Sequence, residues 1–409
     1  MKIYPRENYL KKIRGFYHAD DIIKVITGVR RCGKSKLMET VAGEISRSGV
    51  PKENIIYIDL DLRPNRGIKT ADQLESLILK KGTASGMKYV FVDEIQNVKG
   101  FEEVINGFRT EGGWSIFITG SNSYLLSGEL VTKLTGRYIE FEMFTLSFEE
   151  YEGMKRFYSM EINPNPVLEL NAYITEGGFP RALFFDTPAD KRSYVRNVID
   201  EIFEKDIRNR LKIRSRETFE NVMRFVINNY GTTTSLRNIC DELNKAGTAT
   251  TNNTVDRYVR ALVDAKILYE CPRFDLKSKR SLKGEKKYYL SDLGFFFAEN
   301  TDNRINYGPV LENIVYAYAR SRDYSVSVGR IGKLECDFIL RDTNMSYSYV
   351  QVAYTIANSR ETEDREYRSL ENIRDNYPKY VMTTDYLLQN RSGIANVNLI
   401  DFIKNGEMF

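Results

Sequence analysis

The chain has 409 residues, a formal net charge of +4, one histidine and four cysteines. A single histidine, His18, leaves no second imidazole for a two-histidine metal site and argues against a histidine-based catalytic triad. The cysteines stand singly, without a C-x-x-C pair, which argues against thiolate metal clusters and a disulfide framework. A charge of +4 over this length is too weak to indicate nucleic-acid binding by the whole chain, so any basic surface must be local.

Hydrophobic residues make up 42% of the chain, which is enough for packed cores. No apolar run approaches the ~20 residues that a membrane helix needs. The first residues, MKIYPRENYLKKI, lack the apolar stretch of a signal peptide. We therefore expect a protein of a reducing compartment, most simply the cytoplasm, with no membrane partner.

The first part of the chain alternates between strand-like and helix-like segments. Short apolar runs predict five strands, at residues 22–26, 55–60, 89–92, 114–119 and 138–142. Helical spacing of apolar residues predicts helices at 34–45 and 72–80. Strands that alternate with helices indicate a parallel α/β sheet, in which ligands bind at the carboxyl ends of the strands.

A phosphate-binding motif follows the first predicted strand. Residues 28–35 read G-V-R-R-C-G-K-S and fit G-x-x-x-x-G-K-[ST]. Glycines let backbone N–H groups wrap phosphates, and the start of a helix favours their charge. Lys34 is predicted to reach the β- and γ-phosphates, and Ser35 to ligate Mg²⁺. The strand–loop–helix setting favours this reading over a chance glycine turn, and the nucleotide site is predicted to include also Gly28, Arg31, Cys32, Gly33 and Lys36.

Two carboxylates end a later strand, in Y-V-F-V-D-E at residues 89–94. Asp93 is predicted to hold Mg²⁺ together with Ser35, and Glu94 to polarise the attacking water as a general base. An acidic strand end is common when it occurs alone, but its place after a phosphate loop favours the catalytic interpretation. The next strand is followed by Ser121 and Asn122, which either sense the γ-phosphate or form a plain turn.

These motifs together resemble the AAA-type P-loop ATPases of the additional-strand, catalytic-glutamate class. The segments GVRRCGKS, YVFVDEIQN, ITGSNSYLL and TGRYIEFEMFTLSFEEY, with the turn at residues 177–180, are similar to one prokaryotic family. That family pairs an AAA-type domain with a C-terminal domain of unknown function and is often compared with archaeal AAA ATPases. The resemblance implies ATP as the nucleotide, and the guanine-reading motif N-K-x-D is incomplete at residues 244–247.

Arg137 is the candidate arginine finger, a guanidinium that stabilises charge near the γ-phosphate during hydrolysis. It stands in L-T-G-R, directly before the last predicted strand of this region. The alternative is a surface arginine without a role in catalysis. The sequence leaves open whether Arg137 acts in its own subunit or in a neighbour's.

In the middle of the chain, the alternation of strands and helices ends. Residues 147–215 look helical, and residues 216–292 fit a winged helix, with helices at 217–229, 235–246 and 254–265 and a hairpin from 267–270 and 287–290. Residues 273–287 carry seven Lys or Arg against two acids, and residues 205–216 carry six basic residues against one acid. DNA or RNA is therefore a candidate partner, as is another protein or a second copy, and the candidate nucleic-acid contacts are Lys277, Lys279, Arg280, Lys286 and Lys287.

The last hundred residues resemble a PD-(D/E)XK nuclease-like fold. Glu312 stands on a predicted helix at 311–320, and Asp337 on the strand 335–340 where a metal-binding aspartate is expected. The next strand should end in E-x-K but reads Gln351-Val352-Ala353. It therefore lacks a metal-binding carboxylate and the lysine that would stabilise developing charge. We expect an inactive version with a structural or binding role, and no nuclease activity.

The predicted fold class is α/β, with four regions. Residues 1–146 are expected to form a P-loop NTPase parallel sheet and residues 147–215 a helical lid or linker. Residues 216–292 are expected to form a winged-helix-like domain, and residues 293–409 an α/β restriction-endonuclease-like domain. The leading hypothesis is a Mg-dependent ATPase that couples hydrolysis to rearrangement of the last two domains. The alternatives are a nucleotide-gated signalling switch and a nucleic-acid-binding regulator with little turnover.

Overall fold

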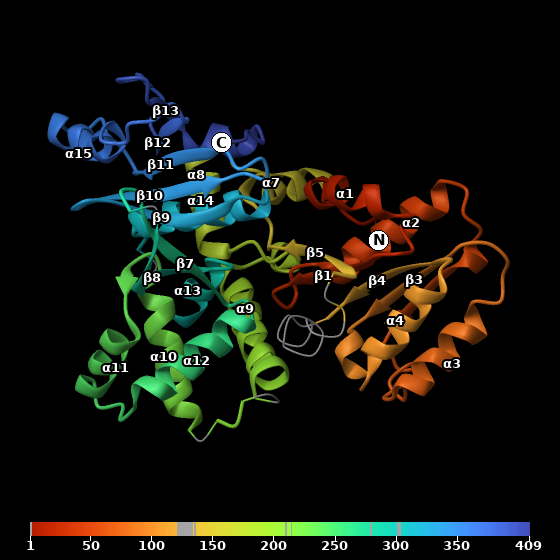
Figure 1. Cartoon of the computed structure of the whole chain (residues 1–409). Coiled ribbons are helices and arrows are strands. Elements are labelled where there is room, and N and C mark those ends of the chain that lie inside the picture. Colours follow the sequence, from red (N-terminus) through yellow and green to blue (C-terminus); the bar gives the residue numbers. More distant parts are fainter. Residues whose placement is uncertain are drawn as a thin grey trace. The chain divides into compact units, whose positions relative to one another are not determined.

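A computed structural model describes residues 2–120, 134, 136–208, 211–213, 215–278, 280–300 and 304–409 of the chain, without the side chains of 281–285. The chain divides into two compact units, Met1–Phe144 and Thr145–Phe409 (Figure 1). The predicted boundaries at 215/216 and 292/293 fall inside the second unit. Among the described residues, no helix combines the length and the apolar content needed to cross a membrane.

The first unit contains a five-stranded parallel sheet, and its strands lie close to the predicted ranges. They are β1 (Ile23–Gly28), β2 (Ile55–Asp59), β3 (Lys88–Asp93), β4 (Trp114–Thr119) and β5 (Tyr138–Met143). Their order across the sheet is β2-β3-β4-β1-β5, and every pairing is parallel. The predicted parallel α/β core is therefore confirmed, and the carboxyl ends of all five strands lie at one edge.

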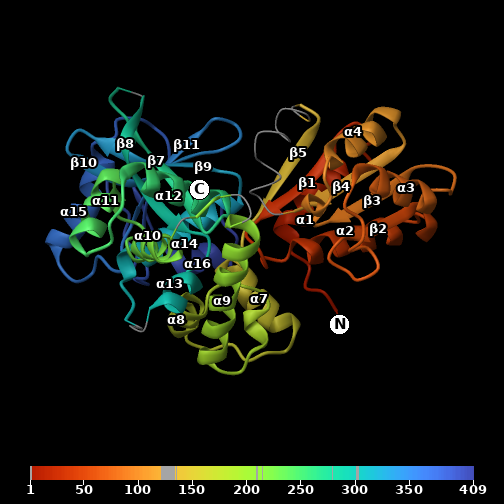
Figure 2. The same ribbon diagram turned by 90° about the horizontal axis from the view of Figure 1, so that it is seen from below.

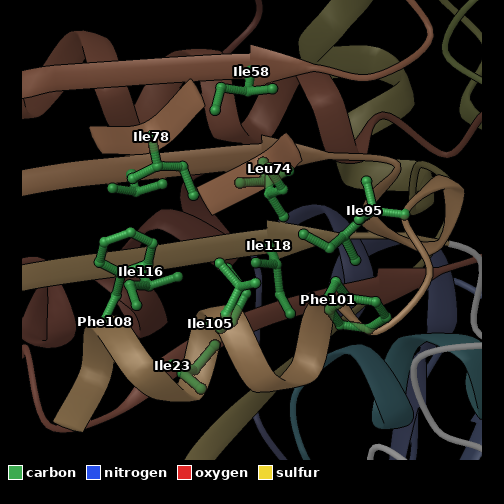
Figure 3. Packing of buried hydrophobic residues seen from close by; sticks show 14 of the residues in the cluster. Ile23, Ile58, Leu74, Ile78, Ile95, Phe101, Ile105, Phe108, Ile116 and Ile118 are labelled. Atoms are coloured by element: carbon green, nitrogen blue, oxygen red, sulfur yellow. The ribbon is translucent and has the colours of Figure 1, made fainter. Parts of the chain in front are cut away.

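Helices cover both faces of this sheet. Helices α3 (Ala71–Lys81) and α4 (Phe101–Glu111) pack on one face through the apolar cluster of Figure 3, to which α3 contributes Leu74 and Ile78 and α4 contributes Ile105 and Phe108. Because side chains alternate along a strand, the stacked rings of Phe91 and Phe117 lie on the other face. Helix α2 (Lys34–Arg47) contacts β1, β3 and β4. The described part of this unit also contains helix α1 (Glu7–Ile13) and the short 3-10 helices Arg14–Phe16, Lys52–Asn54 and Ile95–Asn97.

The second unit combines helices with an eight-stranded sheet of order β13-β12-β11-β10-β9-β7-β8-β6. Its first half contains α7 (Phe148–Phe157), α8 (Pro166–Glu176), the 3-10 helix Ala182–Phe184, α9 (Pro188–Ile202), the π-helix Phe203–Ile207, α10 (Arg216–Asn228), β6 (Thr233–Thr234), α11 (Leu236–Lys245) and α12 (Asn252–Asp264). The remaining elements are β7 (Leu268–Asp275), β8 (Arg280–Leu290), α13 (Gly294–Glu299), α14 (Tyr307–Ser321), β9 (Ser325–Ile331), β10 (Leu334–Arg341), β11 (Tyr347–Val352), α15 (Arg360–Glu371), β12 (Lys379–Thr383), β13 (Ala395–Asn398) and α16 (Leu399–Lys404).

One sheet joins the predicted hairpin to the C-terminal strands. Helices α10, α11 and α12 contact one another, and α12 contacts β7 of the hairpin (Figure 2). Strand β7 pairs antiparallel with β8 and parallel with β9, in the register Arg273 to Val328. The sheet therefore runs across residue 292, where the sequence pattern predicts a domain boundary.

The Gly-Gly-Phe-Pro turn encloses a buried carboxylate. Gly178 N–H donates to Oδ2 of Asp292 at 2.8 Å, and Gly294 N–H donates to Oδ1 at 2.8 Å. Gly177 has a φ of +79°, and a Cβ on it would lie 2.1 Å from Asp292 Oδ1. Burial raises the pKa of Asp292 to about 6, although these donors favour the charged form. The turn thus needs a residue without a side chain at position 177.

Replacing Gly177 by alanine should destabilise the second unit by roughly 1–3 kcal/mol, because it adds both a steric overlap and backbone strain. The control is Gly308→Ala on α14, where a Cβ meets nothing closer than 3.9 Å. Urea unfolding followed by circular dichroism measures both changes. A Gly177→Ala midpoint equal to that of Gly308→Ala would contradict the proposed role of the turn.

Candidate functional site

The phosphate-loop motif connects β1 to α2. Strand β1 ends at Gly28, and α2 begins at Lys34, directly after Gly33. Gly28 has a φ of +140°, and a Cβ there would lie 2.1 Å from the carbonyl oxygen of Met143 on β5. Gly33 has a φ of +110°. Both glycines of the motif are therefore required by the backbone path itself.

Lys34 is held over this loop. Its side chain is buried, with the residue 7% exposed, and its Nζ donates to the carbonyl oxygens of Gly28 at 3.0 Å and Val29 at 3.1 Å. A buried ammonium needs such acceptors or an anion. The loop therefore presents a positive charge at the start of α2, where the helix dipole also favours negative groups.

Asp93 ends β3 beside this loop and is 2% exposed. Burial raises the pKa of its carboxyl group above the usual value, and hydrogen bonds from the Ser35 and Thr119 hydroxyls oppose that shift. Thr119 Oγ1 donates to Asp93 Oδ1. The structure thus brings the two predicted metal ligands, Ser35 and Asp93, into direct contact.

Glu94 follows in a left-handed backbone conformation, with a φ of +57°. Its N–H donates to Thr119 Oγ1 at 3.3 Å, and its Oε2 accepts from Gln96 Nε2 at 2.5 Å. Thr119 therefore contacts both carboxylate residues, a role that the sequence analysis does not assign to it. The only available signal is its position at the end of β4, at the same edge of the sheet.

The other residues predicted around the loop differ in accessibility. Cys32 is buried, whereas Arg31 is exposed and has a φ of +68°. Lys36 is exposed and pairs with Glu39 at 2.8 Å, so only its backbone in the first turn of α2 is placed at the loop. Ser121 and Asn122 lie outside the described residues.

Arg137 lies at the opposite edge of the sheet. Its carbonyl accepts from Ile23 N–H at 3.0 Å, and the next residue, Tyr138, pairs with Ile23 at the start of β1. Gly28, at the other end of β1, is five residues further along, a separation of roughly 16 Å. Arg137 Nη1 donates to Asn106 Oδ1 at 3.3 Å. The structure therefore does not bring Arg137 to Lys34 within one chain.

The basic hairpin is partly neutralised by acids. Lys286 pairs with Glu270 at 2.7 Å, and Lys287 is 5% exposed. Lys277 and Arg280 are exposed, while Lys279 lies outside the described residues. The expectation of an exposed nucleic-acid contact at Lys287 needs correction, because β8 carries this residue into the shared sheet.

Lys287 reaches the carboxylates of the C-terminal strands and of α14. Its Nζ donates to Glu312 at 3.0 Å and Glu335 at 3.0 Å. Burial alone would lower the pKa of Lys287, but Glu312, Asp337 and Glu335 outweigh it, and the pKa lies above its usual value. Asp337 Oδ2 accepts from Val352 N–H at 2.8 Å. These carboxylates thus have a lysine beside them that β8 supplies, whereas position 353 itself remains an alanine.

The residues around Lys34 suit a nucleoside triphosphate with a divalent cation. A loop with glycine at both ends, a buried ammonium and a helix start suit phosphate oxygens. The Ser35 hydroxyl and the Asp93 carboxylate are oxygen ligands of the kind that Mg²⁺ prefers. Glu94 adds a carboxylate that can accept a proton from water.

Two families match parts of the chain. Residues 20–152 match a family described as an AAA domain, and residues 167–303 match a domain of unknown function. An uncharacterized protein of Haemophilus influenzae is 34% identical over 401 residues, which cover 97% of this chain and 98% of that protein. An uncharacterized protein of Methanocaldococcus jannaschii is 28% identical over 359 residues, which cover 85% of this chain and 78% of that protein.

Among solved structures, the ORC2 protein of Aeropyrum pernix covers 76% of this chain and 92% of its own, with 11% identity and a TM-score of 0.40. DnaA of Aquifex aeolicus covers 65% of this chain and 90% of its own, with 16% identity and a TM-score of 0.30.

Thr119→Val should destabilise the first unit by roughly 1–3 kcal/mol, since the Asp93 carboxylate loses a donor and the Glu94 N–H loses an acceptor. Thr119→Ser keeps the hydroxyl and should fall close to the wild type. Thermal and urea unfolding of the two variants measures the difference. Equal stability of the valine and serine variants would show that the hydroxyl does not hold this edge of the sheet.

Proposed function

Because this chain belongs to the same family as the Haemophilus influenzae protein and carries an AAA domain over residues 20–152, we propose that it is a Mg-dependent ATPase. The main support for the proposal is that Lys34 and Ser35 lie at the same edge of the sheet as Asp93 and Glu94. Each of these residue types has a separate task in phosphoryl transfer from ATP to water.

In this proposal the loop amides and Lys34 bind the phosphates, and Ser35 and Asp93 hold Mg²⁺. The Mg²⁺ ion, when bound, neutralises phosphate charge. Lys34 would exchange its carbonyl acceptors for phosphate oxygens, which are better partners for a buried cation. Glu94 orients the attacking water and accepts its proton, while Gln96 and Thr119 fix its side chain and backbone.

Lys34→Ala and Glu94→Gln should separate binding from hydrolysis. Lys34→Ala should abolish measurable ATP binding, because it removes the charge that the loop presents. Glu94→Gln should keep ATP binding but lower kcat by roughly 10²–10⁴-fold, because an amide cannot accept the proton. Phosphate release and equilibrium binding of Mg·ATP measure both, with Lys80→Ala on the exposed side of α3 as the control.

Two results would count against the ATPase proposal. One is a wild-type protein that neither binds Mg·ATP nor releases phosphate, alone or with DNA or RNA. The other is a Lys34→Ala variant with the wild-type dissociation constant. Binding without turnover in the wild type would instead support the nucleotide-gated switch, in which ATP orders an interface and slow hydrolysis releases it.

Arg137 fits the proposal only through a second copy of the chain. It lies at the amino-terminal edge of the sheet, far from its own Lys34. In the proposed oligomer that edge faces the phosphate loop of a neighbour, where a guanidinium in trans stabilises the charge of the transition state. The proposal therefore includes a homo-oligomer as the active form.

Mixing variants tests this arrangement. Lys34→Ala and Arg137→Ala should each be inactive alone, but an equimolar mixture should regain hydrolysis, because one subunit supplies the loop and its neighbour the arginine. Phosphate release is measured before and after mixing. A mixture no more active than its separate components contradicts action in trans, and a fully active Arg137→Ala variant contradicts any catalytic role.

The hydrolysis cycle is further proposed to rearrange the second unit. Within that unit, the element order supports a winged helix, because α10, β6, α11, α12 and the β7–β8 hairpin follow one another as in that fold. Nucleic-acid binding by the hairpin has weaker support, because Lys286 and Lys287 are held by Glu270, Glu312 and Glu335. A protein partner or a second copy suits this mixed-charge surface better.

The C-terminal strands are proposed to be a non-cleaving relative of the PD-(D/E)XK nucleases. The order α14-β9-β10-β11-α15-β12 supports the likeness. Gln351 stands where a carboxylate is expected, and its amide bonds Glu366 at 3.1 Å and the Asp337 N–H at 3.3 Å. The Lys287 ammonium already pairs with both Glu312 and Glu335. These contacts favour a structural ion-pair network over a metal-dependent nuclease.

A further inference from the structure

Arg6 is a buried cation outside every motif of the sequence, and it contacts the phosphate loop. The residue is 6% exposed and stands directly before α1. Its Nη1 donates to the carbonyl oxygen of Cys32 at 3.3 Å and to that of Phe144 at 2.8 Å. Cys32 lies in the middle of the predicted phosphate loop, between Arg31 and Gly33. A side chain 26 residues away therefore bonds the backbone of the loop.

The guanidinium of Arg6 is itself fixed in place. It lies over the ring of Tyr9, with Cζ 4.7 Å from the ring centroid, and Tyr9 is 1% exposed. The Tyr9 hydroxyl accepts from Phe144 N–H at 3.0 Å. Arg6 and Tyr9 thus hold the carbonyl and the N–H of the same residue, Phe144. This double attachment leaves Arg6 little freedom to leave the Cys32 carbonyl.

The bond to Cys32 sets the direction of the following peptide group. The described peptides are trans, so the Cys32 carbonyl and the Gly33 N–H point in opposite directions. Gly33 would also accommodate a rotated Cys32–Gly33 peptide, because glycine adopts negative φ as readily as its present φ of +110°. A carbonyl held outward by Arg6 directs the Gly33 N–H into the loop, where phosphate oxygens are expected.

We propose that Arg6 is a positioning residue of the phosphate loop, which orients the Cys32–Gly33 peptide so that its N–H faces the phosphates of the bound nucleotide. This inference rests on the proposed ATP binding. Charge-assisted hydrogen bonds to backbone carbonyls are strong enough to keep one peptide orientation over another. The positive charge of Arg6 also lies near the loop without occupying it.

Arg6→Met removes the donors and keeps an unbranched apolar side chain of similar reach. The matched control is Arg14→Met, since Arg14 belongs to the same N-terminal segment but pairs with Glu7 and Glu44 at 2.8 Å each. Dissociation constants for Mg·ATP and Mg·ADP are measured on each protein, with its binding stoichiometry and unfolding midpoint. Arg6→Met should bind both nucleotides roughly tenfold to a hundredfold more weakly. Arg14→Met should bind like the wild type.

The dissociation constant separates positioning from a merely structural role. A variant that only unfolds more easily loses binding sites but keeps the affinity of those that remain. Arg6→Lys keeps the charge and one donor position, so its affinities should lie between those of Arg6→Met and the wild type. It also serves as the test if Arg6→Met does not fold.

The outcomes also separate this inference from the proposed function. If the wild type binds Mg·ATP and the foldable Arg6 variants bind within twofold of Arg14→Met, the positioning role is overturned while the ATPase proposal stands. If the wild type and Lys34→Ala both fail to bind, the proposed function fails, and the inference about Arg6 fails with it.

Discussion

Parallel pairing of β3, β4 and β1, in that order across the sheet, is the constraint on which the candidate site depends. It brings the carboxyl ends of three strands to one edge, although they are far apart in the sequence. Because β4 lies between the other two, Thr119 stands between the loop after β1 and the acids after β3. One hydroxyl can then contact both Asp93 and Glu94, and Ser35 reaches Asp93 from α2.

Much of this edge was predictable from the sequence, because its residues belong to contiguous motifs. Lys34 and Ser35 follow β1 after the phosphate loop and Asp93 ends β3, and the parallel arrangement of those strands places them together. The opposite position of Arg137 also follows from this arrangement, since it precedes β5 instead of following it. Arg6 was not predictable, because its partners lie 26 and 138 residues away and nothing in the local sequence marks an arginine that donates to two carbonyls.

Charge patterns along the sequence predicted less than strand patterns. The sequence of residues 205–216 contains mostly basic charges. In the structure, however, Lys205 pairs with Glu201, Arg208 with Glu204, and Arg216 with Glu220. Each of these acids lies four residues from its partner and outside the stretch 205–216, so a count over that stretch misses it. Lys287 is likewise paired with acids that are distant in the sequence, Glu312 on α14 and Glu335 on β10. Counting local charge therefore overstates the positive surface of this protein.

The backbone conformation of Glu94 limits which substitutions can make this protein more stable. A non-glycine residue in the left-handed region is disfavoured by roughly 1 kcal/mol or more, and Glu94 has a φ of +57°. Glycine would relieve that strain and remove the carboxylate at the same time. Stability and chemistry thus conflict at a single position, so that selection for heat resistance alone would favour loss of the proposed general base. Engineering of a more robust form has to leave this residue untouched and look for its gains elsewhere in the fold.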